Sequence, residues 1–357
     1  MIKLVQIKNF KSVVDLTLEL GSFNVLIGEN GCGKSNVLEA IAFGGAASAD
    51  KLDQEFLGSR GIRVTKPEFM FSAFKSNKKR DRFVVCFKTD DYEINHDIYN
   101  GVVNPRKWIV ICRSENIMKY NTSFKKYESK NKIFKHSKIV ISNYVLYSPE
   151  QNSLRKFEES NQILPLGIKG EGLFQYLKEL ASAKKHEKTL LQIKENLSLL
   201  DWFADFKLPK NLMSNEFSLN IKDKYLSENL QYFDQKSTNE GFLLLLFYFT
   251  LFISKDTPTF FAIDNIDSSL NPKLCMQLTK NLAELAKKHK KQVIVTTHNP
   301  AILDGLNLKD DNQRLFVVRR NVDGHTIANR IEYKPERRKN LSELWTSGII
   351  GGLPNNF

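Results

Sequence analysis

The chain has 357 residues and a formal charge of +13, a balance that favours attraction to polyanions such as nucleic acid. No apolar run reaches the roughly 18 residues of a membrane-spanning helix, and the stretch GFLLLLFYFTLFI at 241–253 predicts a buried helix instead. The start MIKLVQIKNF lacks the features of a secretory signal, and the four cysteines show no paired spacing. We therefore expect a cytoplasmic protein with no membrane contact, no disulfide framework and no zinc site.

Residues 1–60 predict three strands, a glycine-rich loop and a helix. The segments IKLVQI and VVDLTLEL alternate apolar and polar residues, whereas FNVLI is continuously apolar, as in a buried central strand. A buried central strand therefore runs directly into the glycine-rich loop.

Residues 61–210 predict an inserted subdomain. Short β-rich runs such as RFVVCF and KWIVIC alternate with basic stretches up to about residue 150, and leucines at helical spacing over 171–205 predict one or two amphipathic helices. We expect this part to act as a lid or a partner-binding region.

Residues 211–357 predict a second α/β lobe. An apolar helix from 241 precedes the strand TFFAI, a helix from Pro272 to Lys291, the strand QVIVTT and a hairpin across RLFVVRR and TIANRIEY. Strands that alternate with helices imply a mostly parallel sheet.

The strongest motif is GENGCGKS, which has the spacing Gly, four residues, Gly-Lys-Ser and stands between an apolar strand and a helix. Glycines let the backbone N–H groups turn toward a phosphate, the lysine neutralises the β- and γ-phosphates, and the serine hydroxyl ligates magnesium. The predicted ATP-binding residues are Gly28, Glu29, Asn30, Gly31, Cys32, Gly33, Lys34, Ser35 and Asn36.

A magnesium site of this kind needs a carboxylate at the end of a second buried strand. Asp264 follows the apolar run TFFAI and comes after the phosphate loop in the chain, as this arrangement requires. An aspartate at a strand end is by itself often a helix cap, so the prediction of Ser35 and Asp264 as the metal residues depends on their pairing.

The segments IKNFKSV, LIGENGCGKSNVLEAI, FFAIDNIDSSLNP and VTTHNPAIL resemble the ABC-type ATPase heads of the RecF, SMC and OLD branch, which includes ATPases of bacterial anti-phage defence systems. The resemblance covers about residues 1–50 and 215–330. It implies an α/β P-loop NTPase fold, a bilobed head with a mostly parallel sheet, here with an inserted α+β subdomain and helical segment. It also implies ATP and Mg²⁺ as cofactors, a homodimer or higher homo-oligomer closed through ATP, and a separate effector such as a nuclease or toxin.

The resemblance also implies roles for residues outside the phosphate loop. His298 matches the switch histidine that senses the γ-phosphate, and Ser268 and Ser269 begin the D-loop segment. The signature segment that contacts ATP on the opposite subunit is best matched by Thr238 to Gly241, with Asn239, Glu240 and Gly241 as the contact residues; a plain helix cap is the alternative. Gln54 and Gln151 both remain candidates for the glutamine loop.

One departure from the family pattern concerns hydrolysis. Relatives place a glutamate after the magnesium aspartate, whereas this chain has Asn265. An amide cannot accept a proton from water at neutral pH, and general-base assistance contributes roughly 10² to 10⁴ in rate. We therefore expect slow hydrolysis, with Lys34, Asp264, Asn265 and His298 forming the catalytic set.

Two other functions remain open. Lysines interleave with aromatic residues at 75–82 and 124–138, a pattern that suits a nucleic-acid backbone, so a RecF-like DNA-repair ATPase that acts directly on DNA is one alternative. A nearly inactive scaffold that binds ATP structurally is the other.

Overall fold

The computed structural model describes residues 1–74, 81–101, 108–116, 135–156, 163–208, 219–227, 230 and 232–353. In chain order its strands are β1 Leu4–Phe10, β2 Val13–Glu19, β3 Phe23–Ile27, β4 Arg82–Lys88, β5 Tyr92–Asn100, β6 Trp108–Asn116, β7 Val145–Tyr147, β8 Phe203–Lys207, β9 Asn220–Asp223, β10 Phe233–Asp234, β11 Phe260–Ile263, β12 Gln292–Thr296, β13 Gln313–Arg320 and β14 Thr326–Ile331. The helices are α1 Lys34–Ser48, α2 Gln54–Ser59, η1 Pro67–Phe69, α4 Gln151–Leu154, α5 Leu173–Ser182, η2 Lys184–His186, α6 Glu187–Leu197, α7 Glu240–Ile253, α8 Pro272–Lys288, η3 Pro300–Gly305 and α9 Leu341–Thr346.

A six-stranded sheet with the order β14-β13-β3-β12-β11-β7 forms the centre of the molecule. All neighbouring strands in it are parallel except the β13–β14 hairpin. Alternate residues of β3 enter different cores, since Val25 and Ile27 belong to one hydrophobic cluster and Leu26 belongs to the other. Both faces are therefore covered, which explains why the runs VLI, FFAI and VIV in β3, β11 and β12 are continuously apolar. The predicted α/β fold with a mostly parallel sheet is confirmed.

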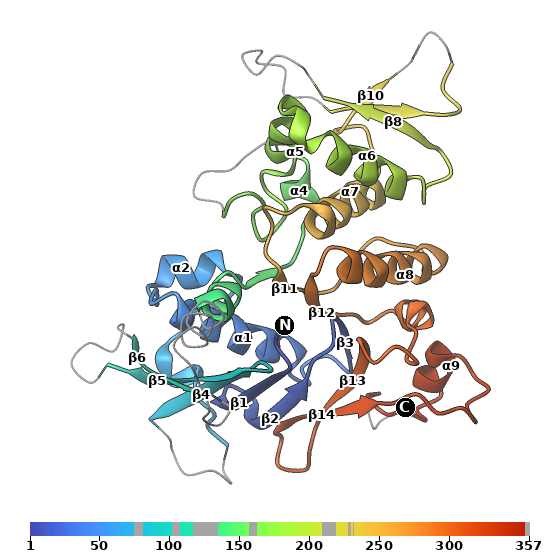
Figure 1. Cartoon of the computed structure of the whole chain (residues 1–357). Coiled ribbons are helices and arrows are strands. Elements are labelled where there is room, and N and C mark those ends of the chain that lie inside the picture. Colours follow the sequence, from blue (N-terminus) through green and yellow to red (C-terminus); the bar gives the residue numbers. More distant parts are fainter. Residues whose placement is uncertain are drawn as a thin grey trace, which may run out of the picture.

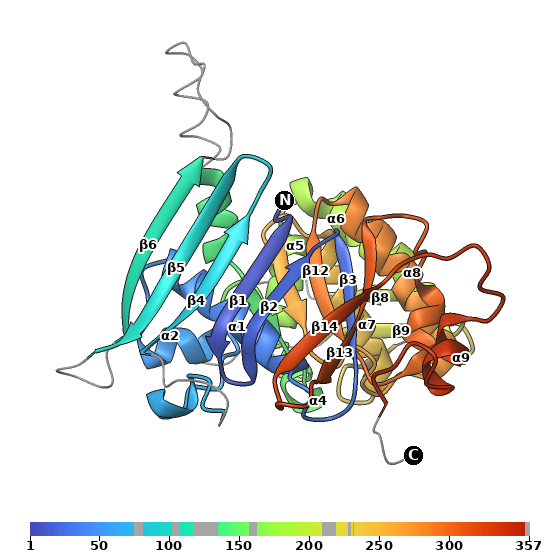
Figure 2. The same ribbon diagram turned by 90° about the horizontal axis from the view of Figure 1, so that it is seen from below.

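A second, antiparallel sheet has the order β2-β1-β4-β5-β6 (Figure 2). Helix α1 contacts strands of this sheet and strands of the central sheet, so it lies between the two. Strands from both sides of residue 60 share the antiparallel sheet, and β7 from the expected insertion belongs to the central sheet. The division of the chain at residues 60 and 210 remains a prediction, and these strand pairings cross its first boundary.

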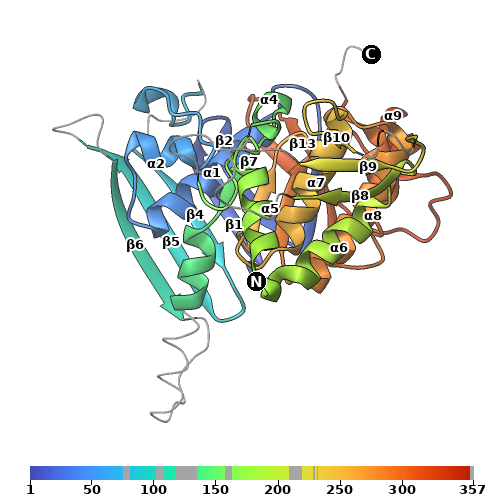
Figure 3. The same cartoon turned by 90° about the horizontal axis from the view of Figure 1, so that it is seen from above.

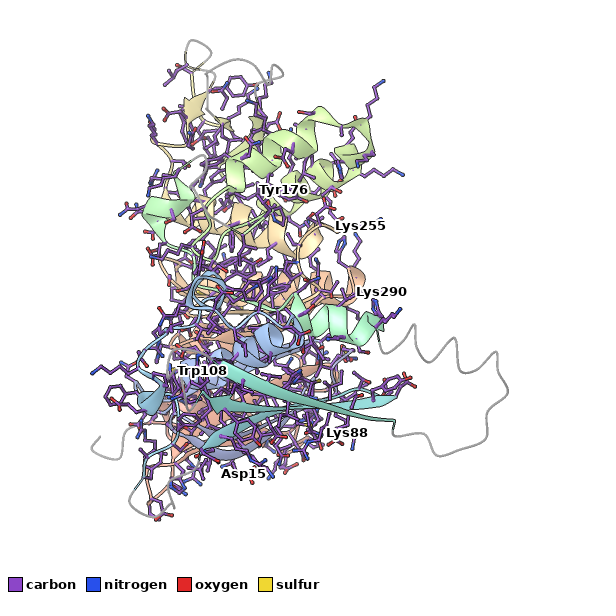
Figure 4. All side chains as sticks on the ribbon, turned by 90° about the vertical axis from the view of Figure 1, so that its left-hand side faces the viewer. Asp15, Lys88, Trp108, Tyr176, Lys255 and Lys290 are labelled. Carbon is purple, nitrogen blue, oxygen red and sulfur yellow. The ribbon has the colours of Figure 1, made fainter. Side chains whose placement is uncertain are left out.

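Helices α7 and α8 cover the other face of the central sheet, and α5, α6 and the three-stranded sheet β10-β9-β8 lie beyond α7 (Figures 1 and 3). Every residue of α7 from Phe242 to Ile253 is buried, which confirms the prediction of a buried helix over this run. The amphipathic helices predicted over 171–205 are α5 and α6. Figure 4 places Tyr176 in this helical part and Trp108 and Lys88 in the antiparallel sheet. Among the described residues, no helix is long and apolar enough to span a membrane.

Candidate nucleotide site

The phosphate loop connects β3 to α1 at the carboxyl edge of the central sheet. Gly28 and Gly33 have φ angles of 147° and 110°, which only glycine adopts readily. A Cβ atom on Gly33 would lie 2.1 Å from Thr326 Oγ1, so this glycine is also required by close packing. Gly31 has a φ of 76°, but a Cβ there would meet nothing within 4 Å. The loop backbone is thus built for approach of an anion to the α1 N-terminus.

Lys34 is the first residue of α1, and its ammonium group folds back over the loop. Nζ donates to Gly28 O at 2.8 Å and to Glu29 O at 3.0 Å. Burial lowers the pKa of the Lys34 ammonium below its usual value, while Cys32 and Asp264 oppose that shift. The Lys34 ammonium group thus lies against two carbonyl oxygens of the phosphate loop. In this position it can donate hydrogen bonds to a bound triphosphate.

Ser35 and Asp264 meet in the tertiary structure, as the expected magnesium site requires. Ser35 Oγ donates to Asp264 Oδ2 at 2.9 Å, and Thr296 Oγ1 donates to Asp264 Oδ1. Asp264 follows β11, whose neighbour β12 ends at Thr296. A hydroxyl and a carboxylate are oxygen ligands of the type that Mg²⁺ prefers, so this pair fits the ion.

The phosphate loop is also held in place by Ser12, Thr326 and Arg320, whose contacts with the loop no sequence pattern indicated. Asn36 Nδ2 donates to Ser12 Oγ at 2.7 Å, Ser12 Oγ lies 2.7 Å from Thr326 Oγ1, and Thr326 Oγ1 donates to Cys32 O at 2.8 Å. Arg320 Nε also donates to Gly31 O at 2.9 Å. Ser12 lies in the β1–β2 turn and Thr326 begins β14, and no local motif links these segments to the loop.

Asn265 directly follows Asp264, and its backbone has a φ of 55°. This left-handed conformation is tolerated by asparagine better than by other residues that carry a Cβ. Its N–H donates to Thr296 Oγ1 at 2.9 Å, and its carbonyl accepts the Ser268 hydroxyl at 2.9 Å. Ser268 and Ser269 are both exposed beyond it. Asparagine thus suits the local backbone at this position, and it places no side-chain carboxylate there.

His298 follows β12 and comes within electrostatic reach of Lys34 and Asp264. Desolvation by partial burial is the main cause that lowers the pKa of its imidazole, and the positive charge of Lys34 acts in the same direction. Asp267 and Asp264 oppose this shift in the pKa of His298, and the net effect favours the neutral imidazole, which has one N–H to donate. The structure brings the phosphate loop, Asp264 and His298 to one edge of the sheet.

The candidate signature segment lies at the N-terminus of α7. Asn239 caps this helix, because its Oδ1 accepts the Phe242 N–H at 2.8 Å. Arg155 donates to the carbonyls of Gln235, Lys236 and Thr238 and so fixes the segment that precedes Asn239. Both roles expected for Asn239 are compatible with this geometry, since a cap residue can also contact a second subunit. A Cβ on Gly241 would lie 3.8 Å from Ser269 O, so the signature and D-loop segments are adjacent.

Between the two glutamine candidates, the sheet topology favours Gln151. It begins α4 shortly after β7, and the carbonyl of Tyr147 at the end of β7 accepts the Asp264 N–H at 2.8 Å. Carboxyl ends of parallel strands share one edge, so Gln151 follows a strand that ends beside Asp264. Gln54 begins α2, which follows α1.

The basic and aromatic residues expected to contact nucleic acid largely lie outside the described residues. These are Lys75, Lys78, Lys79, Arg80, Phe124, Lys125, Lys126, Tyr127, Lys130, Lys132 and Phe134. Nucleic-acid contact therefore stays a prediction.

The fold and the phosphate loop define a P-loop ATPase. The AAA ATPase domain family matches residues 1–303, and the chain belongs to this family. No curated protein matches the chain.

Several solved structures share the fold. The SMC head bound to the C-winged-helix domain of ScpA is 17% identical, with a TM-score of 0.60 and coverage of 93% of this chain and 98% of that one. The SMC head domain from Thermotoga maritima is 14% identical, with a TM-score of 0.53 and coverage of 93% and 99%. The SMC head with an extended coiled coil from Pyrococcus furiosus, bound to the C-terminal domain of ScpA, is 14% identical, with a TM-score of 0.54 and coverage of 93% and 96%. Identity this low carries the fold and not the function.

Proposed function

We propose that this ATPase binds ATP with Mg²⁺ and uses the bound nucleotide to hold two copies of itself together. The observation that carries the proposal is the convergence of Lys34, Ser35 and Asp264, with the Ser35 hydroxyl 2.9 Å from the carboxylate. Lys34 neutralises the phosphates, and Ser35 and Asp264 hold the metal. Magnesium held by Ser35 and Asp264 would neutralise part of the negative charge of the triphosphate.

Exposed residues in the phosphate loop, before α7 and after β11 support dimer formation. Asn30 and Gly31 at the tip of the phosphate loop are exposed, as are Asn239 and Ser269. The segment before α7 combines a helix N-terminus with a glycine, and both suit approach to a phosphate held by another copy. We therefore assign Asn239, Glu240 and Gly241, together with the two D-loop serines, to contacts across the dimer.

Slow hydrolysis makes ATP a lasting clamp in this proposal. Asn265 has no proton-accepting group, so the closed state persists until nucleotide leaves or slow turnover occurs. A long-lived closed dimer can regulate or deliver a separate effector, such as a nuclease or toxin. The resemblance to ATPases of anti-phage defence systems makes defence the setting that we propose.

Light scattering after gel filtration tests the clamp. With ATP and Mg²⁺ the full chain is expected to double its mass, whereas with ADP it stays at the lower mass. Lys34→Ala should remove the shift, because ATP loses a charge-assisted hydrogen-bond donor. Lys290→Ala changes an exposed lysine on the loop after α8 and should leave the shift intact. A chain that binds ATP but keeps one mass under all conditions would refute the clamp.

A further inference from the structure

Two neighbouring threonines tie the loops that follow β11 and β12, and each accepts one hydrogen bond and donates another. Thr296 Oγ1 accepts the Asn265 N–H at 2.9 Å and donates to Asp264. Thr297 Oγ1 accepts the Asn299 N–H at 2.9 Å and donates to Asp267 Oδ1 at 2.6 Å. The side chains of both threonines are buried.

The hydrogen bonds of Thr297 involve the residues on either side of His298 in the chain. Thr297 precedes the histidine, and its hydroxyl accepts a hydrogen bond from the backbone N–H of Asn299, which follows it, so this contact spans the exposed His298 along the chain. A hydroxyl has one proton to donate. Because that proton goes to Asp267, the lone pairs of the oxygen are directed toward the Asn299 N–H.

Asp267 connects this turn to the loop that carries Asp264. The Ile266 N–H donates to Thr296 O at 3.1 Å, so the chain around Asp267 continues the backbone pairing beyond the end of β11. The carboxylate of Asp267 is thus fixed relative to the metal aspartate, and Thr297 is fixed relative to Asp267. The metal residue and the switch histidine are held in one hydrogen-bonded unit.

We propose that Asp267 and Thr297 are positioning residues that hold His298 for recognition of the γ-phosphate. This inference rests on the proposed function and on the γ-phosphate contact that the family resemblance implies for His298. The pair sets how strongly the site prefers ATP over ADP, since ADP lacks the group that the histidine contacts. Asp267 contributes an acceptor oxygen to the Thr297 hydroxyl.

Equilibrium binding of ATP and ADP, each with Mg²⁺, tests the proposal on the full chain. Thr297→Val keeps the shape of the side chain and removes the hydroxyl, and Asp267→Ala removes its acceptor. Asp267→Ala is expected to weaken ATP binding about fivefold, as for the loss of one buried hydrogen bond, and to leave ADP binding unchanged. Thr297→Val should weaken ATP binding at least as much, because the Asn299 N–H also loses its acceptor. Thr297→Ser and Asp267→Asn retain the donor and an acceptor oxygen and should stay close to the wild-type preference.

The double variant Thr297→Val with Asp267→Ala should bind ATP no more weakly than Thr297→Val alone, because the valine already removes the contact that Asp267→Ala breaks. Thr250→Val removes a buried hydroxyl that bonds Leu246 O within α7 at 2.7 Å, and it controls for a general loss of stability. Equal weakening of ATP and ADP, additive single effects, or a loss in Asp267→Asn as large as in Asp267→Ala would overturn the proposal. A wild-type chain that binds neither nucleotide would instead refute the proposed function.

Discussion

Ser35 Oγ donates a hydrogen bond to Asp264 Oδ2 at 2.9 Å, although the two residues are 229 positions apart in the chain. The contact joins the helix after β3 to the end of β11, and β12 lies between these strands in the sheet. Two oxygen atoms that can ligate a metal, one from the start of α1 and one from the end of β11, therefore meet at the position where this class of ATPase needs its metal.

Ser35→Ala should weaken ATP binding only when magnesium is present. The substitution removes one metal ligand and the hydrogen-bond partner of Asp264, so we expect about a tenfold loss of affinity with Mg²⁺ and little change in the presence of a chelator. Titration calorimetry under both conditions measures this. Ser198→Ala is the matched control, because that exposed serine bonds only Glu195 O in its own helix. Equal losses with and without the metal would argue against a ligand role.

Asn265→Glu should accelerate hydrolysis. A carboxylate at this position can accept a proton from water, and we expect at least a tenfold rise in single-turnover rate. The φ of 55° is less favourable for glutamate, so a small loss of stability should accompany the gain. Asn265→Gln is the matched control, because glutamine has the length of glutamate but carries no proton-accepting carboxylate. Phosphate release no faster in the glutamate variant than in the glutamine variant would show that the base is supplied elsewhere.

Gly33→Ala should abolish nucleotide binding, whereas Gly31→Ala should reduce it only modestly. Both glycines have positive φ, so both substitutions introduce backbone strain. Only at Gly33 does the added Cβ collide with Thr326 Oγ1 and Ser12 Oγ, at 2.1 and 2.8 Å. Fluorescence of a labelled ATP analogue reports the two affinities. Similar losses in both variants would mean that strain, and not the brace beneath the loop, is decisive.

Stability should fall as the pH drops from about 6.5 toward 4, in part because of His96. Burial lowers the pKa of this imidazole to about 4 in the folded chain, and its Nε2 lies 2.9 Å from Ser48 Oγ. The unfolded chain then binds more protons than the folded chain over this range, so acid favours unfolding, by up to about 3 kcal/mol.

Urea unfolding at several pH values measures this slope. His96→Gln should flatten it between pH 6.5 and 4, even though the substitution lowers stability at pH 7. His136→Gln, at an exposed position, should leave the slope unchanged. An unaltered slope in His96→Gln would assign the acid sensitivity to other groups.

The sequence by itself determined the parts of this protein that depend on local chemistry. Three such features each lie within one short segment of the chain. They are the spacing of GENGCGKS, the apolar strands before it and before Asp264, and the apolar stretch of α7. Glycine conformation, strand periodicity and burial follow from such segments without knowledge of the rest of the chain.

Only the tertiary structure decided which distant segments meet. The β1–β2 hairpin pairs with β4 across residues that looked like an insertion, and Ser12, Thr326 and Arg320 brace the phosphate loop from two separate turns. The contact between Asp267 and Thr297 likewise depends on β11 lying parallel to β12. Strand order and register set these contacts, and both result from how two cores pack on one sheet, which no short pattern in the chain encodes.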